Sequence, residues 1–176
     1  MIFDRGDKIL FIGDSISDYS RAKPVGEGLF NAWGTSYVAC AGALLGCMYP
    51  EEHLRVVNMG IDGNQCRDLE KRWQTDVMDQ HPDWVSVLIG INDVWRQFDS
   101  PAMPDQMVPP EEYRENVRKM ILTEKPHVRT TAASSTARVR KNRLFFIFGF
   151  LLFVGVVCVR LWQGNFAAGV SGEERG

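Results

Sequence analysis

The sequence predicts an α/β domain built on a parallel β-sheet. Three apolar runs typical of buried strands, over 8–13, 54–59 and 84–90, alternate with stretches whose apolar side chains recur at helical spacing. Strands that are separated by helices of this length are joined by right-handed crossovers and lie parallel in one sheet. A chain of 176 residues that is 45% hydrophobic is long enough for one domain with a sizeable core.

The first strand, over 8–13, begins almost at the amino terminus and ends in a Gly-Asp-Ser turn. The stretch over 35–48 carries apolar residues at helical spacing, and Pro50 stops the predicted helix. The second strand, over 54–59, follows after a few residues. These elements form the first strand–helix–strand unit of the predicted sheet.

The next unit begins with a helix predicted over 65–77, which has one apolar face. The third strand, over 84–90, is apolar on both faces, as a central parallel strand is. A proline-rich loop over 100–109 follows. Pro110 and the two acidic residues after it then open another helix.

The character of the sequence changes at the end of this domain, which we place at 1–128. Small polar residues and a basic cluster predict a linker over 129–143. The apolar run over 144–162 predicts a C-terminal apolar helix, which is a candidate transmembrane helix, and a tail over 163–176 follows. A buried core helix is the alternative for this run. The basic flank would place its amino side in the cytoplasm.

Charge and cysteine content exclude several classes of protein. A net charge of −2 gives no basic face for nucleic acid. The amino terminus lacks the basic start and long apolar region of a secretory signal, so we expect a cytoplasmic domain, with membrane anchoring through 144–162 as an option. Cys40 and Cys47 lie on one apolar helical stretch and predict small buried hydrophobes, with neither a disulfide framework nor a zinc site.

Three successive strand ends carry groups that suit acyl transfer. Ser15 follows the first strand, Gly60 the second and Asn92 the third. Because the carboxyl ends of parallel strands meet at one edge of a sheet, we expect these groups to lie together. Ser15 would offer its hydroxyl as nucleophile and its N–H to an oxyanion, with the Gly60 N–H and the Asn92 amide as further donors. Each of these residues taken alone could serve only in a turn or a helix cap. The three together, at successive strand ends, favour a functional site.

The three strand ends resemble the sequence blocks of the SGNH hydrolases, a family of GDSL-type serine esterases and lipases. Gly13-Asp14-Ser15 is similar to the first block, Gly60 to the glycine of the second, and Gly-Ile-Asn-Asp over 90–93 to the third. The resemblance covers roughly residues 5–128. It implies a flavodoxin-like three-layer α/β/α sandwich, a nucleophilic Ser15, a small acyl or acetyl ester as substrate, and no metal or organic cofactor.

One block of the family has no counterpart here. SGNH hydrolases carry their base in an Asp-x-x-His block near the carboxyl terminus, and this sequence contains no Asp-x-x-His. His53 and His81 precede strands, and His127 falls where another strand would begin, so all three are expected at the edge opposite Ser15. The scaffold is therefore predicted to be C-terminally incomplete, with the third strand left as an edge. A frameshift or gene fusion near Arg129 is one hypothesis, which the other reading frames would test.

Two functions fit this pattern. The first is a serine ester hydrolase that is impaired by the loss of the Asp-x-x-His block. The alternative is a catalytically crippled, membrane-attached binding domain on the same scaffold. A phosphate-binding module of flavodoxin type is a third reading, but the loop after the first strand lacks the glycines that cradle phosphate. The sequence leaves the ester and the oligomeric state open.

Residues around the strand ends carry weaker signals. Trp95 and Phe98 would either line a substrate pocket or pack the loop after the third block, and 62–64 predict a turn. Arg21 and its neighbours are expected in a solvated loop, and the charged run over 67–72 is expected on an exposed helix face.

Overall fold

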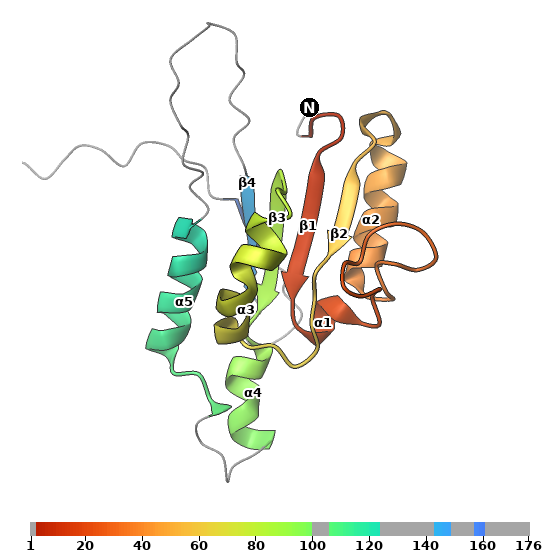
Figure 1. Ribbon diagram of the computed structural model, residues 1–176. Helices are drawn as coiled ribbons and strands as arrows, with labels where there is room; N and C mark the ends of the chain where they lie inside the picture. The colour runs from red at the N-terminus through yellow and green to blue at the C-terminus, as the bar shows by residue number, and fades with distance from the viewer. Residues whose placement is uncertain (1–2, 100–105, 124–142, 149–156, 161–176) are drawn as a thin grey trace, which may run out of the picture.

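A mixed β-sheet forms the centre of the computed structural model, which describes residues 3–99, 106–123, 143–148 and 157–160. In these ranges the sheet has five strands in the order β2-β1-β3-β4-β5 (Figure 1). The strands are β1 (Lys8–Gly13), β2 (Arg55–Asn58), β3 (Trp84–Ile89), β4 (Arg143–Phe148) and β5 (Val157–Arg160). The first four pair in parallel, and β5 is antiparallel to β4. The predicted parallel sheet is confirmed, and its order is that of flavodoxin-like folds.

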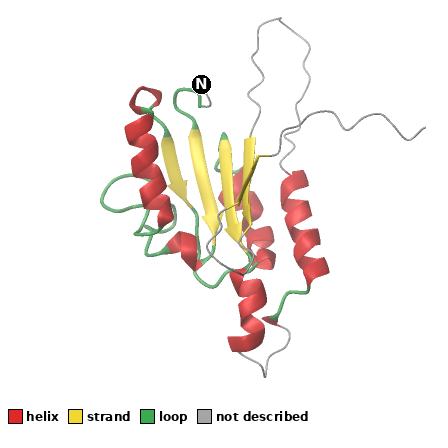
Figure 2. Ribbon diagram, turned by 180° about the vertical axis from the view of Figure 1, so that it is seen from behind, coloured by secondary structure: helices red, strands yellow, loops and turns green. Residues whose placement is uncertain are grey.

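Helices cover both faces of the sheet, as Figures 1 and 2 show from opposite sides. α2 packs on one face, and α3 and α5 pack on the other. Their bounds, with those of the shorter helices, are α1 (Ser15–Asp18), α2 (Tyr37–Met48), α3 (Cys66–Trp73), α4 (Ile91–Asp99) and α5 (Pro110–Thr123). α3 continues into a π-helical turn, η2 (Gln74–Met78). The expected three layers are therefore present.

The side chains of β1 alternate between the two cores, as a strand requires. Leu10 and Ile12 are fully buried in the core beneath α3 and α5. Ile9 and Phe11 face the opposite way and pack with Val38 of α2. Each fully buried aliphatic side chain of this kind stabilises the fold by about 1.5–3 kcal/mol. β1 lies between β2 and β3, and its alternation joins both helical layers to the sheet.

The C-terminal apolar segment departs from its prediction. In the described part of 144–162, strands β4 and β5 stand where one apolar helix is predicted. β4 pairs with β3 from Trp84↔Arg143 to Ile89↔Phe148. A run of aromatic and branched residues suits a parallel strand as well as a helix, because an unbroken apolar run has no periodicity that separates the two. The helix prediction is therefore wrong for these residues, and no helix within the described ranges is long and apolar enough to cross a membrane.

The pairing with β4 also corrects the expectation that the third strand forms an edge. β3 lies between β1 and β4 and has hydrogen-bonded neighbours on both sides. Of the linker predicted over 129–143, only Arg143 lies within the described residues, where it begins β4. The predicted tail over 163–176 lies outside them.

The outer face of α2 is more exposed than its composition suggests. The helix has no charged residue, and the prediction that Cys40 and Cys47 are buried is wrong, because both are exposed free cysteines. Leu44 and Met48 are exposed on the same helix. Its inner face, around Val38 and Gly42, is the part that packs on the sheet.

Candidate active site

The carboxyl ends of β1, β2 and β3 meet at one edge of the sheet, where α1 and α4 lie (Figure 1). β1 leads into Ser15 at the start of α1, and β3 leads into Asn92 in the first turn of α4. The loop after β2 crosses the end of β1, because the Ile61 N–H donates to the Gly13 carbonyl at 3.0 Å. The three strand ends are thus adjacent, as predicted.

Ser15 stands at the amino end of α1 with its donors unused. Asp14 caps this helix, and its Oδ1 accepts from the Ile16 N–H at 3.0 Å. The next two amides, of Ser17 and Asp18, donate to the Asp14 carbonyl. Among the described residues, neither the N–H nor the hydroxyl of half-buried Ser15 has a hydrogen-bond partner. Both groups are available to a ligand at this edge.

Gly60 does not present a free amide in the same way. Its N–H donates to Asn58 Oδ1 at 2.9 Å, and a Cβ at this position would overlap the backbone nitrogen of Asp18. Asn58 in turn donates to the Ser17 carbonyl at 2.7 Å. The glycine is needed because α1 packs directly against the loop. This geometry does not support the predicted use of the Gly60 N–H.

Replacing Gly60 with alanine should destabilise the fold by about 2–3 kcal/mol, because the new methyl group meets backbone rather than a side chain that can move. Gly46→Ala is the matched control. Gly46 lies in α2 with open space around its Cβ position, so alanine should stabilise that helix by about 0.5–1 kcal/mol. Urea denaturation of both variants measures the two changes. Equal stability of Gly60→Ala and the parent chain would contradict the packing argument.

Asn92 keeps a side-chain donor for a ligand. One N–H of its Nδ2 donates to the Asn64 carbonyl at 3.0 Å, which fixes the plane of the amide. The second N–H of the amide group has no partner in the described residues. Gln65 Nε2 donates to the Asn92 carbonyl at 3.1 Å and ties the start of α4 to the start of α3. The amide is therefore held in one orientation with one donor to spare.

Two buried carboxyl groups lie behind the serine. Asp14 is 1% exposed, and its Oδ2 has no hydrogen-bond partner among the described residues. Burial, aided by the nearby charges of Asp93 and Asp62, raises the pKa of Asp14 to about 6. Burial also raises the pKa of Asp93, whose two oxygens accept from the Cys66 N–H at 3.0 and 3.2 Å. Below about pH 6 Asp14 is therefore mostly neutral, whereas at neutral pH its charge is buried near Asp93.

Asp14→Asn should stabilise the protein more at neutral than at acidic pH. The pKa of Asp14 is raised from 3.8 to about 6 in the folded state, so its contribution to stability is full below 3.8 and is lost as the pH rises through about 6. Asparagine stays neutral and keeps an oxygen for the Ile16 N–H. The difference in the free energy of unfolding between Asp14→Asn and the parent chain should therefore increase by about 2–3 kcal/mol between about pH 4 and about pH 7. Urea denaturation at several pH values measures it, and parallel profiles would contradict it.

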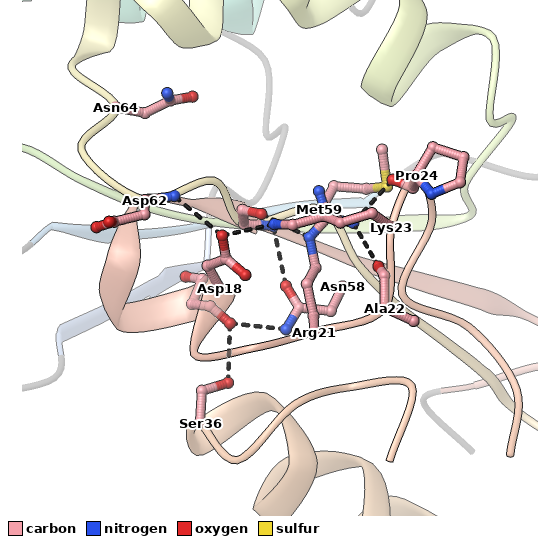
Figure 3. Close-up of polar contacts among 12 residues, drawn as sticks. Asp18, Arg21, Ala22, Lys23, Pro24, Ser36, Asn58, Met59, Asp62 and Asn64 are labelled. Carbon is pink, nitrogen blue, oxygen red and sulfur yellow. Dashed lines mark hydrogen bonds and ion pairs between the residues drawn. The ribbon is translucent and has the colours of Figure 1, made fainter. Parts of the chain in front are cut away.

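Sequence reasoning missed two arginines near the site, and Figure 3 shows one of them, Arg21, among its partners. Arg21 is 4% exposed rather than solvated, and its Nε donates to the Gly60 carbonyl at 2.5 Å. Its Nη1 donates to the carbonyls of Ala22 and Pro24 at 2.9 and 2.8 Å. Arg72, which was expected on an exposed face, donates to the loop from the other side. Only the folded backbone brings these carbonyls together, so no local pattern indicates them.

The described histidines lie where they were predicted. His53 and His81 are exposed, and they come shortly before β2 and β3, at the amino edge of the sheet. His127 lies outside the described residues. Neither described histidine is at the edge that carries Ser15. Among the residues that the structure describes, no cluster of His, Cys, Asp and Glu could hold a metal ion.

The segment after the third block is a helix rather than the expected loop. α4 carries Trp95 and Phe98, which are 52% and 68% exposed. Its buried anchor is Asp93, and Val108 donates its N–H to the Asp93 carbonyl at 3.2 Å. Both aromatic side chains are thus presented outward from α4. The predicted turn at 62–64 is confirmed, since Asp62 and Gly63 form a turn before α3.

Fold and site together define a doubly wound α/β protein whose functional groups gather at the carboxyl edge of its parallel strands. The chain belongs to the GDSL-like lipase/acylhydrolase family, whose sequence pattern it matches over residues 11–151. This confirms the family to which the sequence blocks pointed.

The relatives of the chain include esterases. It is 56% identical over 124 residues to an acetylxylan esterase of Geobacillus stearothermophilus, an alignment that covers 70% of this chain and 57% of the relative. A crystal structure of that esterase superimposes with a TM-score of 0.69 at 55% identity, covering 72% of this chain and 57% of the other. Catalytic mutants of the same esterase, with a histidine, an aspartate or a serine changed to alanine, also have a TM-score of 0.69, at 54% or 55% identity.

A solved structure of a protein from a different source is also similar to the chain. An α/β hydrolase from the metagenome of Lake Arreo in Spain has a TM-score of 0.66 at 52% identity, over 69% of this chain and 56% of that protein. The chain therefore spans less than two thirds of the length of these relatives.

Proposed function

We propose that the chain is a GDSL-type serine ester hydrolase that acts on small acyl or acetyl esters. The observation that carries this proposal is the free hydroxyl and N–H of Ser15 at the edge that also holds Asn92, with its oriented amide. The acetylxylan esterase among the relatives favours acetylated sugars as the substrate class.

The reaction would follow acyl transfer through a serine ester. The Ser15 Oγ attacks the carbonyl carbon of the ester and loses its proton to a base, while the carbonyl oxygen becomes an oxyanion. The Ser15 N–H and the spare N–H of Asn92 donate to that oxyanion; a single donor of this kind is worth about 10²–10³ in kcat. The alcohol leaves with a proton, and water then releases the acid from Ser15.

The loop after β2 offers two glycine amides as a third donor. The predicted donor, Gly60, would first have to release its hydrogen bond to Asn58. Gly63, with φ +73°, lies in the turn nearer to α3, and its N–H has no partner among the described residues. We therefore favour Gly63 over Gly60 for this role.

A second candidate function rests on the missing base. The relative has a catalytic histidine and aspartate, whereas here His53 and His81 lie at the opposite edge and the sequence has no Asp-x-x-His block. A domain without a base would bind esters at this edge and turn them over only at the residual rate left by oxyanion stabilisation and binding.

Acetate release by the full chain tests the proposal, with 4-nitrophenyl acetate and acetylated xylo-oligosaccharide as substrates. Hydrolysis of both at a rate proportional to protein concentration supports an esterase. Folded protein that binds the oligosaccharide without releasing acetate supports the binding domain instead. Circular dichroism of the same sample establishes that the protein is folded.

A further inference from the structure

The guanidinium group of Arg72 contacts the segments that follow both β1 and β2. Arg72 lies near the end of α3, and its Nη2 donates to the Gly13 carbonyl at 3.1 Å. Its Nη1 donates to the Met59 carbonyl at 2.8 Å, and its Nε donates to Asn64 Oδ1 at 2.8 Å. One side chain therefore binds the end of β1 and both ends of the loop after β2.

These acceptors are next to the proposed catalytic groups. Gly13 lies two residues before Ser15, in the turn that leads into α1. Asn64 is the residue whose carbonyl accepts from the Asn92 side-chain amide at 3.0 Å. Arg72 thus reaches Ser15 through the backbone and Asn92 through Asn64.

The guanidinium charge of Arg72 is paired with a carboxylate that lies outside the proposed site. Asp76, one turn further along the same helical segment, accepts from Nη1 at 2.7 Å. Only 14% of the Arg72 side chain is exposed, so the ion pair is shielded from solvent. Because the pair fixes the guanidinium plane, the three bonds to the loop and to β1 keep fixed directions.

If Arg72 served only to hold helices together, its bonds to the segments beside the proposed site would have no bearing on the reaction. The neighbouring arginine of the same helix, Arg67, illustrates such a role. It donates to Glu112 of α5 through Nε and Nη2, both at 2.9 Å, and so joins the two helices. Arg72 differs, because its bonds outside its own helix go to Gly13, Met59 and Asn64 at the carboxyl edge.

We propose that Arg72 is a positioning residue, which sets the Asn92 amide through Asn64 and the start of α1 through Gly13. This role rests on the proposed esterase function. A planar, five-donor guanidinium can make the three bonds at once, whereas a lysine at the same position supplies one point charge and cannot. Arg72→Lys therefore keeps the charge and loses the geometry.

Nuclear magnetic resonance of the side-chain amides tests the positioning without any substrate. The Asn92 NH₂ pair is identified as the signal that Asn92→Asp removes. We expect Arg72→Lys to shift this pair and Arg67→Lys to leave it in place. An unchanged Asn92 pair in Arg72→Lys, or an equal shift in both variants, would overturn the proposal.

Steady-state kinetics with 4-nitrophenyl acetate tests the consequence for the reaction. Arg72→Lys should lower kcat about 10- to 100-fold, with KM little changed, because misplaced donors cost the transition state more than the ground state. Asn64→Ala should lower kcat similarly. The two losses should not add in the double variant, since both substitutions remove the hydrogen bond from Arg72 Nε to Asn64 Oδ1. Asn64→Asp keeps an oxygen for Nε and should retain most of the rate.

The outcomes separate this role from the function on which it rests. No turnover by the unmodified chain overturns the proposed function. Turnover that depends on Ser15, with equal kcat in Arg72→Lys and Arg67→Lys, overturns only the role of Arg72. A rise in KM at constant kcat would also overturn it, since that pattern indicates loss of substrate binding rather than misplacement of the oxyanion donors.

Discussion

Replacing Ser15 with alanine should lower kcat for 4-nitrophenyl acetate by at least about 10³-fold, because it removes the hydroxyl that we propose as the nucleophile. The hydroxyl of Ser15 makes no hydrogen bond in the described structure, so the substitution removes the reacting atom and little else. Steady-state kinetics measures the loss, and thermal unfolding of the variant should match that of the parent chain.

Ser17→Ala is the matched control in the same helix. Its Oγ lies 3.1 Å from the Tyr37 hydroxyl in a partly buried contact, so alanine should cost about 1 kcal/mol of stability without removing the proposed reacting group. If Ser15→Ala and the parent chain hydrolyse the ester equally slowly, no base acts with Ser15, and the binding-domain function is the correct one.

Asn92→Ala should lower kcat about 10²- to 10³-fold with little change in KM, because its spare N–H is the side-chain donor that we propose for the oxyanion. The loss of its bond to the Asn64 carbonyl affects the fold less, since that contact is only partly buried. The kinetics of acetate release measure both constants.

Gln97→Ala is the control for effects of a substitution in α4 that do not involve the Asn92 amide. Gln97 donates to the Val94 carbonyl at 3.0 Å, within its own helix, and takes no part in the proposed chemistry. A loss of kcat in Gln97→Ala as large as that in Asn92→Ala would mean that α4, rather than the amide, is what the reaction needs.

Much of the fold could be predicted from the sequence, because the spacing of apolar residues that specifies each element lies within that element. The run over 8–13 coincides with β1, and the helices predicted over 35–48 and 65–77 differ by only a few residues from α2 and from α3 with its π-helical turn. Apolar spacing and capping residues specify these elements without reference to distant contacts. The sequence does not indicate α4, because its first three residues belong to the Gly-Ile-Asn-Asp block, whose position after an apolar run predicts a strand end followed by a loop.

The C-terminal segment shows where local patterns are ambiguous. An apolar run of aromatic and branched side chains suits a membrane helix, a core helix or a buried strand equally. Pairing of β4 with β3 decides among them, and that pairing joins residues about 60 positions apart in the sequence. Prediction from spacing alone could not include this contact.

The candidate site was predicted in part, for a related reason. Ser15 and Asn92 follow strands, so the topology of the sheet predicts their common edge. The burial of Arg21 depends on carbonyl acceptors from distant segments, which composition does not indicate. Gly60 was assigned to the oxyanion because glycine allows close approach, but the group that approaches it is α1.

The loop after β2 is held largely through its main chain, and this bears on how freely its sequence can change. Arg21 and Arg72 donate to the carbonyls of Gly60 and Met59. Asp18 accepts from the Asp62 N–H at 3.0 Å (Figure 3). Main-chain contacts of this kind persist when a side chain is exchanged. Exchange of the Ile61 or Asp62 side chain should therefore leave the amides of the loop in their positions. A loop held in this way tolerates change in these side chains while the carboxyl edge of the sheet, with Ser15 and Asn92, keeps its shape.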